Sequence, residues 1–130
     1  MRFEKHYTRD QARALLPKIR TWLEGLVELR DKLHKLDQRI SELMAPGKDI
    51  GGPVVNQWAR SFVDVKRILL EFHVRDIQLK DLDRGLIDFP AIIEDREVFL
   101  CWELQEEDIG FWHDLDAGYA GREPLSGEDL

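Results

Sequence analysis

The sequence predicts an α+β fold, in which a long antiparallel hairpin of two coiled-coil-like helices carries a small antiparallel β-sheet docked on its open end. Three observations predict this fold. Apolar residues recur with heptad spacing over residues 12–43, a shorter repeat of the same kind covers residues 55–72, and a pattern rich in β-branched and aromatic residues follows from Ile77. A chain of 130 residues has the size of one compact domain. We therefore expect a single domain over residues 1–130, with a helical hairpin at 8–75, a small β-rich subdomain at 76–125 and a flexible tail at 126–130.

The first helix is predicted to begin after Thr8, because Thr8 and Gln11 have the spacing of a capping box. It should end near Met44, because Ala-Pro-Gly follows. Pro17 lies beyond the first turn and removes a hydrogen bond, so the helix either kinks there or is broken after a short leading helix. Two heptad series, three residues apart, give the coiled-coil pattern: Ala12, Ile19, Leu26, Leu33 and Ile40, and Leu15, Trp22, Leu29, Leu36 and Leu43.

The second helix is predicted from a matching repeat. Its apolar positions are Val55, Trp58, Phe62, Val65, Leu69 and Phe72. The connecting loop, Ala45–Pro53, is short, so the two helices should lie antiparallel. Because the first helix is the longer, its N-terminal half has no helical partner, and we expect that half to pack against the sheet.

Three strands are predicted in the last third of the chain. The segments IQLKD, LIDFPAII and EVFLCWEL carry strand patterns, and turns are expected at Asp83–Gly85 and Glu94–Arg96. Pro90 has no N–H to donate, so its strand should lie at an edge or carry a bulge there.

The third of these strands has two largely apolar faces. Val98, Leu100, Trp102 and Leu104 lie on one face, and Phe99, Cys101 and Glu103 lie on the other. Both faces should therefore be covered, one by the first helix and the other by the segment Ile109–Tyr119.

Composition excludes several classes of protein. The net charge is −7, which disfavours non-specific binding to nucleic acid or to an anionic membrane, and we expect neither as a partner. No apolar run has the length of a membrane span, and the start of the chain lacks the apolar stretch of a signal peptide. The single cysteine cannot form an internal disulfide, and a cytoplasmic location is expected.

Charge is spread unevenly along the chain. Residues 1–20 carry six Lys or Arg and two acids, a balance of +4, whereas residues 94–130 carry two Arg and twelve acids, a balance of −10. The basic head and the acidic tail should either attract one another, within one chain or between two, or form two separate solvated surfaces.

The histidines and the cysteine are candidates for a metal site. His73, Cys101 and His113 supply ligand atoms of the kind that zinc prefers, although no HExxH or paired-cysteine spacing is present. The alternative is that Cys101 is a small buried apolar residue and that both histidines make structural hydrogen bonds. The residues identify no cofactor.

A polar cluster near the end of the third strand is the candidate ligand site. Its members are Asp88, Glu103, Glu106, His113 and Arg122. Asp88 stands among apolar residues, where an unpaired acid is costly. An Arg122–carboxylate pair that locks the tail onto the sheet is the simplest account, and a clamp for a ligand carboxylate or phosphate is the alternative. The glycines form no phosphate-binding loop, and no Gly-x-Ser-x-Gly motif indicates a nucleophilic serine.

Three stretches carry a resemblance: YTRDQARALLP, KDLDRGLIDFPA and LCWELQEEDIGFWHDLDAGYAGREPL. Together they resemble the bacterial family known as domain of unknown function 2203, over nearly the whole chain. The specific blocks are residues 85–90, 100–102, 112–113 and 121–124. The family pattern has a glycine before the acid that follows the strand, and this chain has Gln105 there, before Glu106, which puts a tight turn at that point in doubt. The resemblance implies a small cytosolic bacterial protein and no substrate, cofactor or catalytic residue.

Two classes of function follow from these observations. The first is a non-enzymatic interaction or scaffolding module that acts through the helical hairpin, because heptads are regular and no catalytic set is complete. The second is a ligand- or metal-binding protein, or a small enzyme, that uses the polar cluster at the end of the 97–104 strand. Whether the protein is an enzyme stays open.

Self-association as a dimer is expected, and a different protein could bind the same hairpin. The expectation rests on a wide apolar strip on the first helix that the second helix leaves unpaired, formed by Leu15, Leu16, Ile19, Trp22 and Leu23. The alternative is that Phe111, Trp112 and Tyr119 fold back over the strip within one chain.

Overall fold

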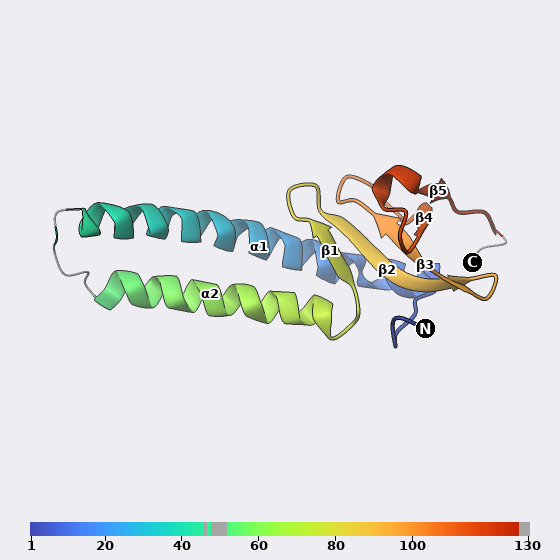
Figure 1. Ribbon diagram of the computed structural model, residues 1–130, viewed down its shortest axis with the longest axis horizontal. Coiled ribbons are helices and arrows are strands. Elements are labelled where there is room, and N and C mark those ends of the chain that lie inside the picture. Colours follow the sequence, from blue (N-terminus) through green and yellow to red (C-terminus); the bar gives the residue numbers. More distant parts are fainter. Residues whose placement is uncertain (46, 48–51, 128–130) are drawn as a thin grey trace.

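The computed structural model describes residues 1–45, 47 and 52–127, and it confirms the α+β fold (Figure 1). Helices α1 (Arg9–Met44) and α2 (Gly52–His73) form an antiparallel hairpin, and a five-stranded antiparallel sheet lies at its open end. The sheet order follows the chain, and the elements are β1 (Gln78–Asp81), β2 (Leu86–Ile93), β3 (Arg96–Trp102), β4 (Phe111–Asp114), the 3₁₀ turn η1 (Tyr119–Gly121) and β5 (Glu123–Pro124).

Helix α1 begins with the predicted capping box. The Thr8 Oγ1 accepts a hydrogen bond from the Gln11 backbone N–H at 3.1 Å, and the Gln11 side chain accepts one from the Thr8 N–H at 3.0 Å. The helix continues unbroken through Pro17 and ends at Met44, so the alternative of a separate leading helix is wrong. Most of the predicted loop over 45–53, and residues 128–130 of the predicted flexible tail, lie outside the described residues. Neither helix, over its described length, is apolar enough to cross a membrane.

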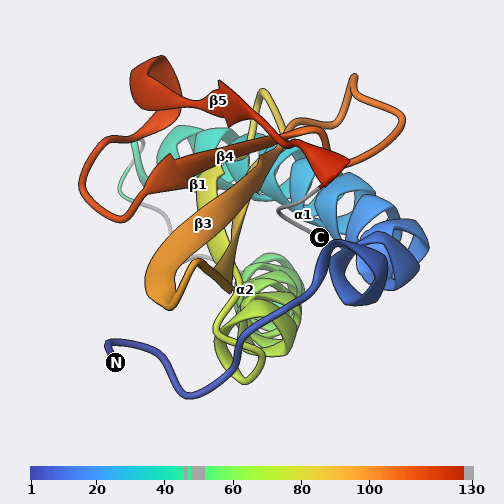
Figure 2. The ribbon, with the colours of Figure 1, turned by 90° about the vertical axis from the view of Figure 1, so that its right-hand side faces the viewer.

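The three predicted strands are present, and two more were not predicted. Glu94 and Asp95 form the turn between β2 and β3 and both have positive φ angles, 52° and 62°. Strands β4 and β5 extend the sheet beyond β3, on the side away from α2 in the end-on view (Figure 2). The segment Ile109–Tyr119 therefore continues the sheet in part, where the sequence predicted that it would cover a face.

The prediction for Pro90 is wrong, because β2 is an inner strand and pairs with β3 without a bulge at that residue. The proline is tolerated because β1 ends its pairing with β2 at Gln78, opposite Asp88. At Pro90, the edge of β2 that pairs with β1 further along has no strand beside it. The missing N–H of the proline therefore breaks no hydrogen bond of the sheet. There the Pro90 carbonyl accepts a hydrogen bond from the Tyr7 N–H at 2.8 Å.

The hydrophobic core lies between the N-terminal half of α1 and one face of the sheet. The helix contributes Ala12, Leu16, Ile19, Leu23 and Leu26, and the sheet contributes Ile87, Phe89, Ala91, Ile93, Val98, Leu100 and Trp102. The apolar strip on which the dimer prediction rested is thus largely buried within one chain, and the sheet covers it. The dimer itself stays a prediction.

The basic head and the acidic tail meet within one chain. Arg9 and Arg13 both pair with Asp108, at 3.2 Å and 2.8 Å, and Arg2 lies 3.8 Å from Asp116. The Arg9 Nε also donates to the Ile109 carbonyl at 2.7 Å. The contacts of Arg9 and Arg13 hold the start of α1 against the segment between β3 and β4.

Candidate functional site

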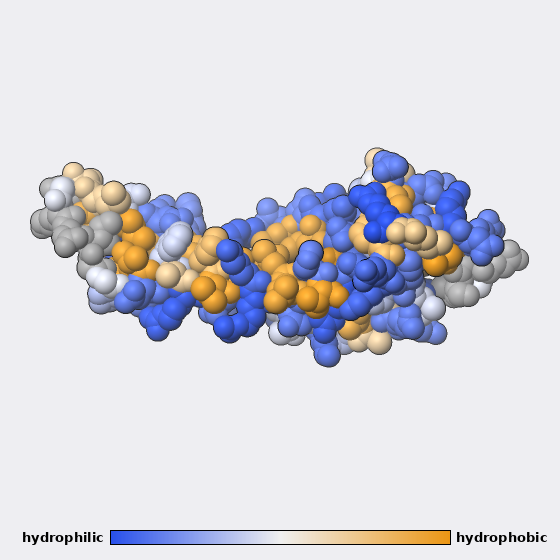
Figure 3. Space-filling view, turned by 60° about the horizontal axis from the view of Figure 1, so that its bottom comes forward, coloured by the Kyte–Doolittle hydropathy of each residue, from blue (hydrophilic) through white to orange (hydrophobic). Residues whose placement is uncertain are grey.

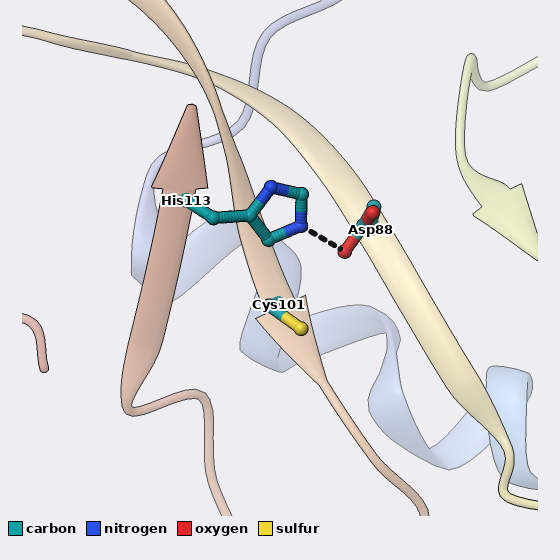
Figure 4. Close-up of side chains that lie close together, drawn as sticks. All are labelled: Asp88, Cys101 and His113. Carbon is teal, nitrogen blue, oxygen red and sulfur yellow. Dashed lines mark hydrogen bonds and ion pairs between the residues drawn. The ribbon is translucent and has the colours of Figure 1, made fainter. Parts of the chain in front are cut away.

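Three adjacent strands bring Asp88, Cys101 and His113 together on the sheet face opposite to α1 (Figure 4). Asp88 in β2 and Cys101 in β3 are directly paired in the sheet register. His113 in β4 pairs with Phe99, two residues before Cys101, so it is a diagonal neighbour of the cysteine on the same face. The two-residue periodicity of each strand fixes this arrangement.

The three side chains are buried and close. Their exposed fractions are 3% for Asp88, 0% for Cys101 and 2% for His113. The His113 Nε2 lies 3.0 Å from the Asp88 Oδ1, and the His113 Nδ1 lies 2.7 Å from the Asp114 carbonyl oxygen. One ligand-type atom from each residue lies within 4.8 Å of the other two.

The partners of His113 determine where its protons are. A carbonyl oxygen only accepts hydrogen bonds, so the Nδ1 must donate a proton to Asp114. The contact between Nε2 and the Asp88 carboxyl then needs one further proton, carried by either group. No buried side-chain nitrogen or oxygen in the described part of the chain lacks a partner. A cation at this position would therefore replace the shared proton.

Cys101 lacks the features of a nucleophile. Burial first, and then the charge of Asp88, raise the pKa of its thiol to about 12, so the thiol stays protonated near neutral pH. Both ring nitrogens of His113 are already bonded to Asp88 and Asp114, so the histidine does not serve the cysteine as a base. The trio is not arranged for covalent catalysis by the cysteine.

A cavity of about 190 Å³ lies beside the trio, and all three side chains line it. Phe99 and Lys80 form part of its wall on the sheet side. Leu115, Gly118 and Tyr119 form another part, and these residues belong to the C-terminal segment, residues 115–125. The C-terminal segment thus shields the face that α1 does not cover.

A second polar cluster, centred on Glu103, fastens the C-terminal segment. The Arg84 Nε and Nη2 donate to one Glu103 oxygen at 3.0 Å and 2.7 Å, and the Tyr119 hydroxyl and Arg122 donate to the other at 2.8 Å and 3.3 Å. Arg122 also donates to Glu106 at 2.5 Å, and its guanidinium lies 3.7 Å from the Phe111 ring centroid. Burial acts to raise the pKa of Glu103, but the hydrogen bonds from Tyr119 and Arg84 outweigh it and hold that pKa below its ordinary value.

The candidates from the sequence thus divide between two clusters. Asp88, Cys101 and His113 form one, and Glu103, Glu106 and Arg122 form the other. His73 is the exposed last residue of α2 and belongs to neither. The simpler account of Arg122, a carboxylate pair that locks the tail, matches the geometry with Glu103 and Glu106 as partners, while Asp88 is bonded to His113.

Sequence reasoning did not find Lys80, Arg84 or Tyr119. Lys80 lies where the pairing of β1 with β2 shifts register, between Leu79 and Asp81, so counting along the strand does not place it. Tyr119 lies just before Arg122 in a glycine-rich loop, and nothing in that pattern indicates its bond to Glu103.

Comparison with known proteins gives one match. No curated protein and no solved structure matches the chain. A family model described as an uncharacterized conserved protein, DUF2203, matches residues 5–125, which is nearly the whole described chain. The match includes every residue of both clusters, and the chain belongs to the DUF2203 family.

Proposed function

We propose that this protein binds a divalent transition-metal ion through Asp88, Cys101 and His113. A carboxylate oxygen, a thiolate sulfur and an imidazole nitrogen form a mixed donor set of the kind that zinc uses, whereas magnesium and calcium prefer oxygen alone. A buried cluster of these residue types on three separate strands is the observation that carries the proposal.

The distances fit such an ion with small adjustments. Zinc binds nitrogen and oxygen at about 2.0–2.2 Å and sulfur at about 2.3 Å, so its donors lie roughly 3.3–3.8 Å apart in a tetrahedron. The three donors here lie within 4.8 Å of one another. Rotation of the side chains would have to change these separations by up to about 1.5 Å.

The orientation of His113 supports the proposal further. Histidines that bind metal with one ring nitrogen commonly donate the other N–H to a carbonyl or carboxylate, which fixes the tautomer. The Nδ1 of His113 makes that bond to the Asp114 carbonyl, and its Nε2 points into the cluster. The metal would take the place of the shared proton, and binding would release the thiol proton of Cys101 as well.

The proposal is tested by titrating the protein, purified without an affinity tag and stripped with a chelator, with cobalt(II) and zinc. Cobalt bound to a thiolate gives a charge-transfer band in the near ultraviolet. We expect one equivalent of cobalt to give this band and zinc to displace it. Cys101→Ser should abolish the band, and Asp88→Asn, which removes a charged ligand, should weaken binding by more than the roughly tenfold to hundredfold that loss of a residue supporting a ligand costs.

Matched controls separate the site from loss of the fold. His73→Asn changes an exposed histidine outside the cluster and should leave the titration unchanged. Circular dichroism of Cys101→Ser, which is nearly isosteric, checks that the variant is folded. A folded wild-type protein that gives no band, or a Cys101→Ser variant that keeps it, would contradict the proposal.

We also propose that the hairpin associates with a second copy of the chain through α2. Val63 and Leu70 on α2, with Val74 just after it, are 53%, 54% and 48% exposed. Apolar residues gather along this face of the hairpin in the space-filling view (Figure 3). If two α2 helices lie antiparallel, with Val63 of each level with Val74 of the other, then these apolar side chains meet along the pairing. Such a two-fold pairing would cover apolar surface that a single chain leaves exposed.

Sedimentation equilibrium tests this second proposal. Wild type should exceed the monomer mass of 15.3 kDa at tens of micromolar protein, and Leu70→Glu should sediment as a monomer. A wild-type mass of 15.3 kDa contradicts the proposal.

We further propose a cytoplasmic location, because Cys101 is a free thiol and reducing compartments keep thiols in that form.

A further inference from the structure

We infer that the metal proposed here keeps one coordination position open to the adjacent cavity, and that this position takes a small monoanion held by Lys80. The inference rests on the proposed function, since it concerns the same metal. It adds the chemical class of the ligand.

The number of donors leaves the position open. Zinc in structural sites has four protein ligands, whereas zinc with three protein ligands keeps a fourth position for water or a substrate. The described residues supply three donors within reach of one another. All three line the cavity of about 190 Å³, so the free position faces a space that a ligand can enter.

The charges at the site favour an anion. A divalent ion is neutralised by one carboxylate, Asp88, and one thiolate, Cys101, and a neutral His113 adds no charge. Lys80 lines the same cavity, and its Nζ lies 5.5 Å from the Phe99 ring centroid. Lys80 makes no ion pair within the described part of the chain. With the metal bound, these groups together carry one uncompensated positive charge, which a monoanion would balance.

The remaining walls restrict the size and chemistry of the ligand. The cavity is smaller than the roughly 300–1,000 Å³ of pockets that hold drug-sized ligands. Its other contacts include the apolar side chains of Leu86, Phe99 and Leu115. The Tyr119 hydroxyl is already engaged by Glu103. A carboxylate with a short apolar substituent therefore fits better than a sugar, a nucleotide or a cation.

The test uses cobalt-loaded protein and reads the visible absorption of the metal, which changes when a ligand enters its coordination shell. Acetate is the probe, and acetamide, which has the same shape without the charge, is its control. We expect acetate to shift the spectrum saturably and acetamide to leave it unchanged. Lys80→Met should weaken acetate binding by about fivefold, the effect of one partly exposed charge, and Lys80→Arg should restore most of it.

Each outcome bears on a separate statement. Lys35→Met, which removes an exposed lysine on α1, should leave acetate binding as in the wild type. If cobalt binds and acetate does not alter its spectrum, the inference is overturned and the metal site stands. If acetate and acetamide act alike, or if Lys80→Met binds acetate as well as the wild type, the role of charge and of Lys80 is wrong. If cobalt does not bind, the proposed function has failed and the inference fails with it.

Discussion

The imidazole of His113 and the carboxyl group of Asp88 share one proton across 3.0 Å, and both side chains are almost wholly buried. The other ring nitrogen of His113 is committed to the Asp114 carbonyl. A buried pair of this kind links β2 to β4 over the intervening β3, so it acts as a structural contact when no metal is bound.

Asp88→Asn should be tolerated better than Asp88→Ala in the metal-free protein. With asparagine, a neutral His113 can accept a hydrogen bond at Nε2 from the amide while Nδ1 still donates to Asp114. With alanine, the Nε2 is left buried and unpaired, which should lower the free energy of unfolding by about 1–3 kcal/mol. Urea unfolding in the presence of a chelator measures the free energy of unfolding of both variants. If both variants lose the same free energy of unfolding, the hydrogen bond from asparagine does not replace the carboxylate, and the charge of Asp88 is what stabilises its contact with His113.

Ile19→Ala should destabilise a single chain, because Ile19 is 0% exposed between α1 and the sheet. The expected loss is about 2–5 kcal/mol, the range for removing a large aliphatic side chain from a core. Val63→Ala on the exposed face of α2 is the control and should change stability by about 0.5 kcal/mol or less. Unfolding should be followed at a concentration where the protein is monomeric. A small effect of Ile19→Ala under those conditions would contradict the burial of Ile19 within one chain.

The helices could be predicted because their signals are local and repeated. Heptads, the capping box at Thr8 and the Ala-Pro-Gly after Met44 each act within a few residues, and α1 has these bounds. Pro17 was harder, because one missing hydrogen bond costs less than the packing along a long helix supplies. Strand β4 was missed because a segment of four residues, Phe111–Asp114, is defined by its pairing with β3 and not by a pattern of its own.

The same distinction applies to the site. The turn at Glu94 and Asp95 sets Ile93 opposite Arg96, and counting back from it sets Asp88 opposite Cys101. The turn predicted from the sequence, Glu94–Arg96, is one residue longer and would have set Asp88 opposite Trp102, so that register was wrong by one residue. The position of His113 could not be counted either, because an irregular segment separates β3 from β4 and no count of residues predicts its register. Residue type alone suggested His73, and the fold leaves it at the exposed end of α2.

Acid should weaken the contact between the head of the chain and Asp108. The hydrogen bond from Arg13 is the main cause that holds the pKa of Asp108 below its ordinary value, and the Ile109 N–H and the charge of Arg9 add to it. A carboxyl whose pKa is lower in the folded state stabilises the fold above its unfolded pKa, and this contribution disappears as the pH falls through the folded pKa. Asp108→Asn should therefore be less stable than the wild type at about pH 7, and the difference should shrink below about pH 4.

Urea midpoints measured across that pH range test this prediction. Asp116→Asn is the control, because the Asp116 side chain is 99% exposed and lies 3.8 Å from Arg2. Its midpoint should follow that of the wild type at every pH. If the difference in urea midpoint between Asp108→Asn and the wild type stays constant down to the lowest pH, the charge of Asp108 does not contribute to stability.

Arg122 should hold the C-terminal segment onto the sheet through its shape as well as its charge. Its side chain is 10% exposed and bonds to both Glu103 and Glu106, and its guanidinium carbon lies 3.7 Å from the Phe111 ring centroid. Arg122→Ala should lower the free energy of unfolding by about 1.5–3 kcal/mol, the value for hydrogen bonds to charged groups. Arg122→Lys should recover little of it, because an ammonium group cannot form the planar fork or stack on the ring in the same way.

Hydrogen exchange locates the effect of these Arg122 variants. The backbone amides of residues 115–125 should exchange faster in Arg122→Ala, while those of α1 exchange as in the wild type under conditions where the fold persists. Arg96→Ala removes an exposed pair with Asp114 and should leave the segment protected. If Arg122→Lys protects residues 115–125 as well as arginine does, then charge alone fastens the segment. The contact between the guanidinium and Phe111 would in that case contribute nothing to closing the face that carries Asp88, Cys101 and His113.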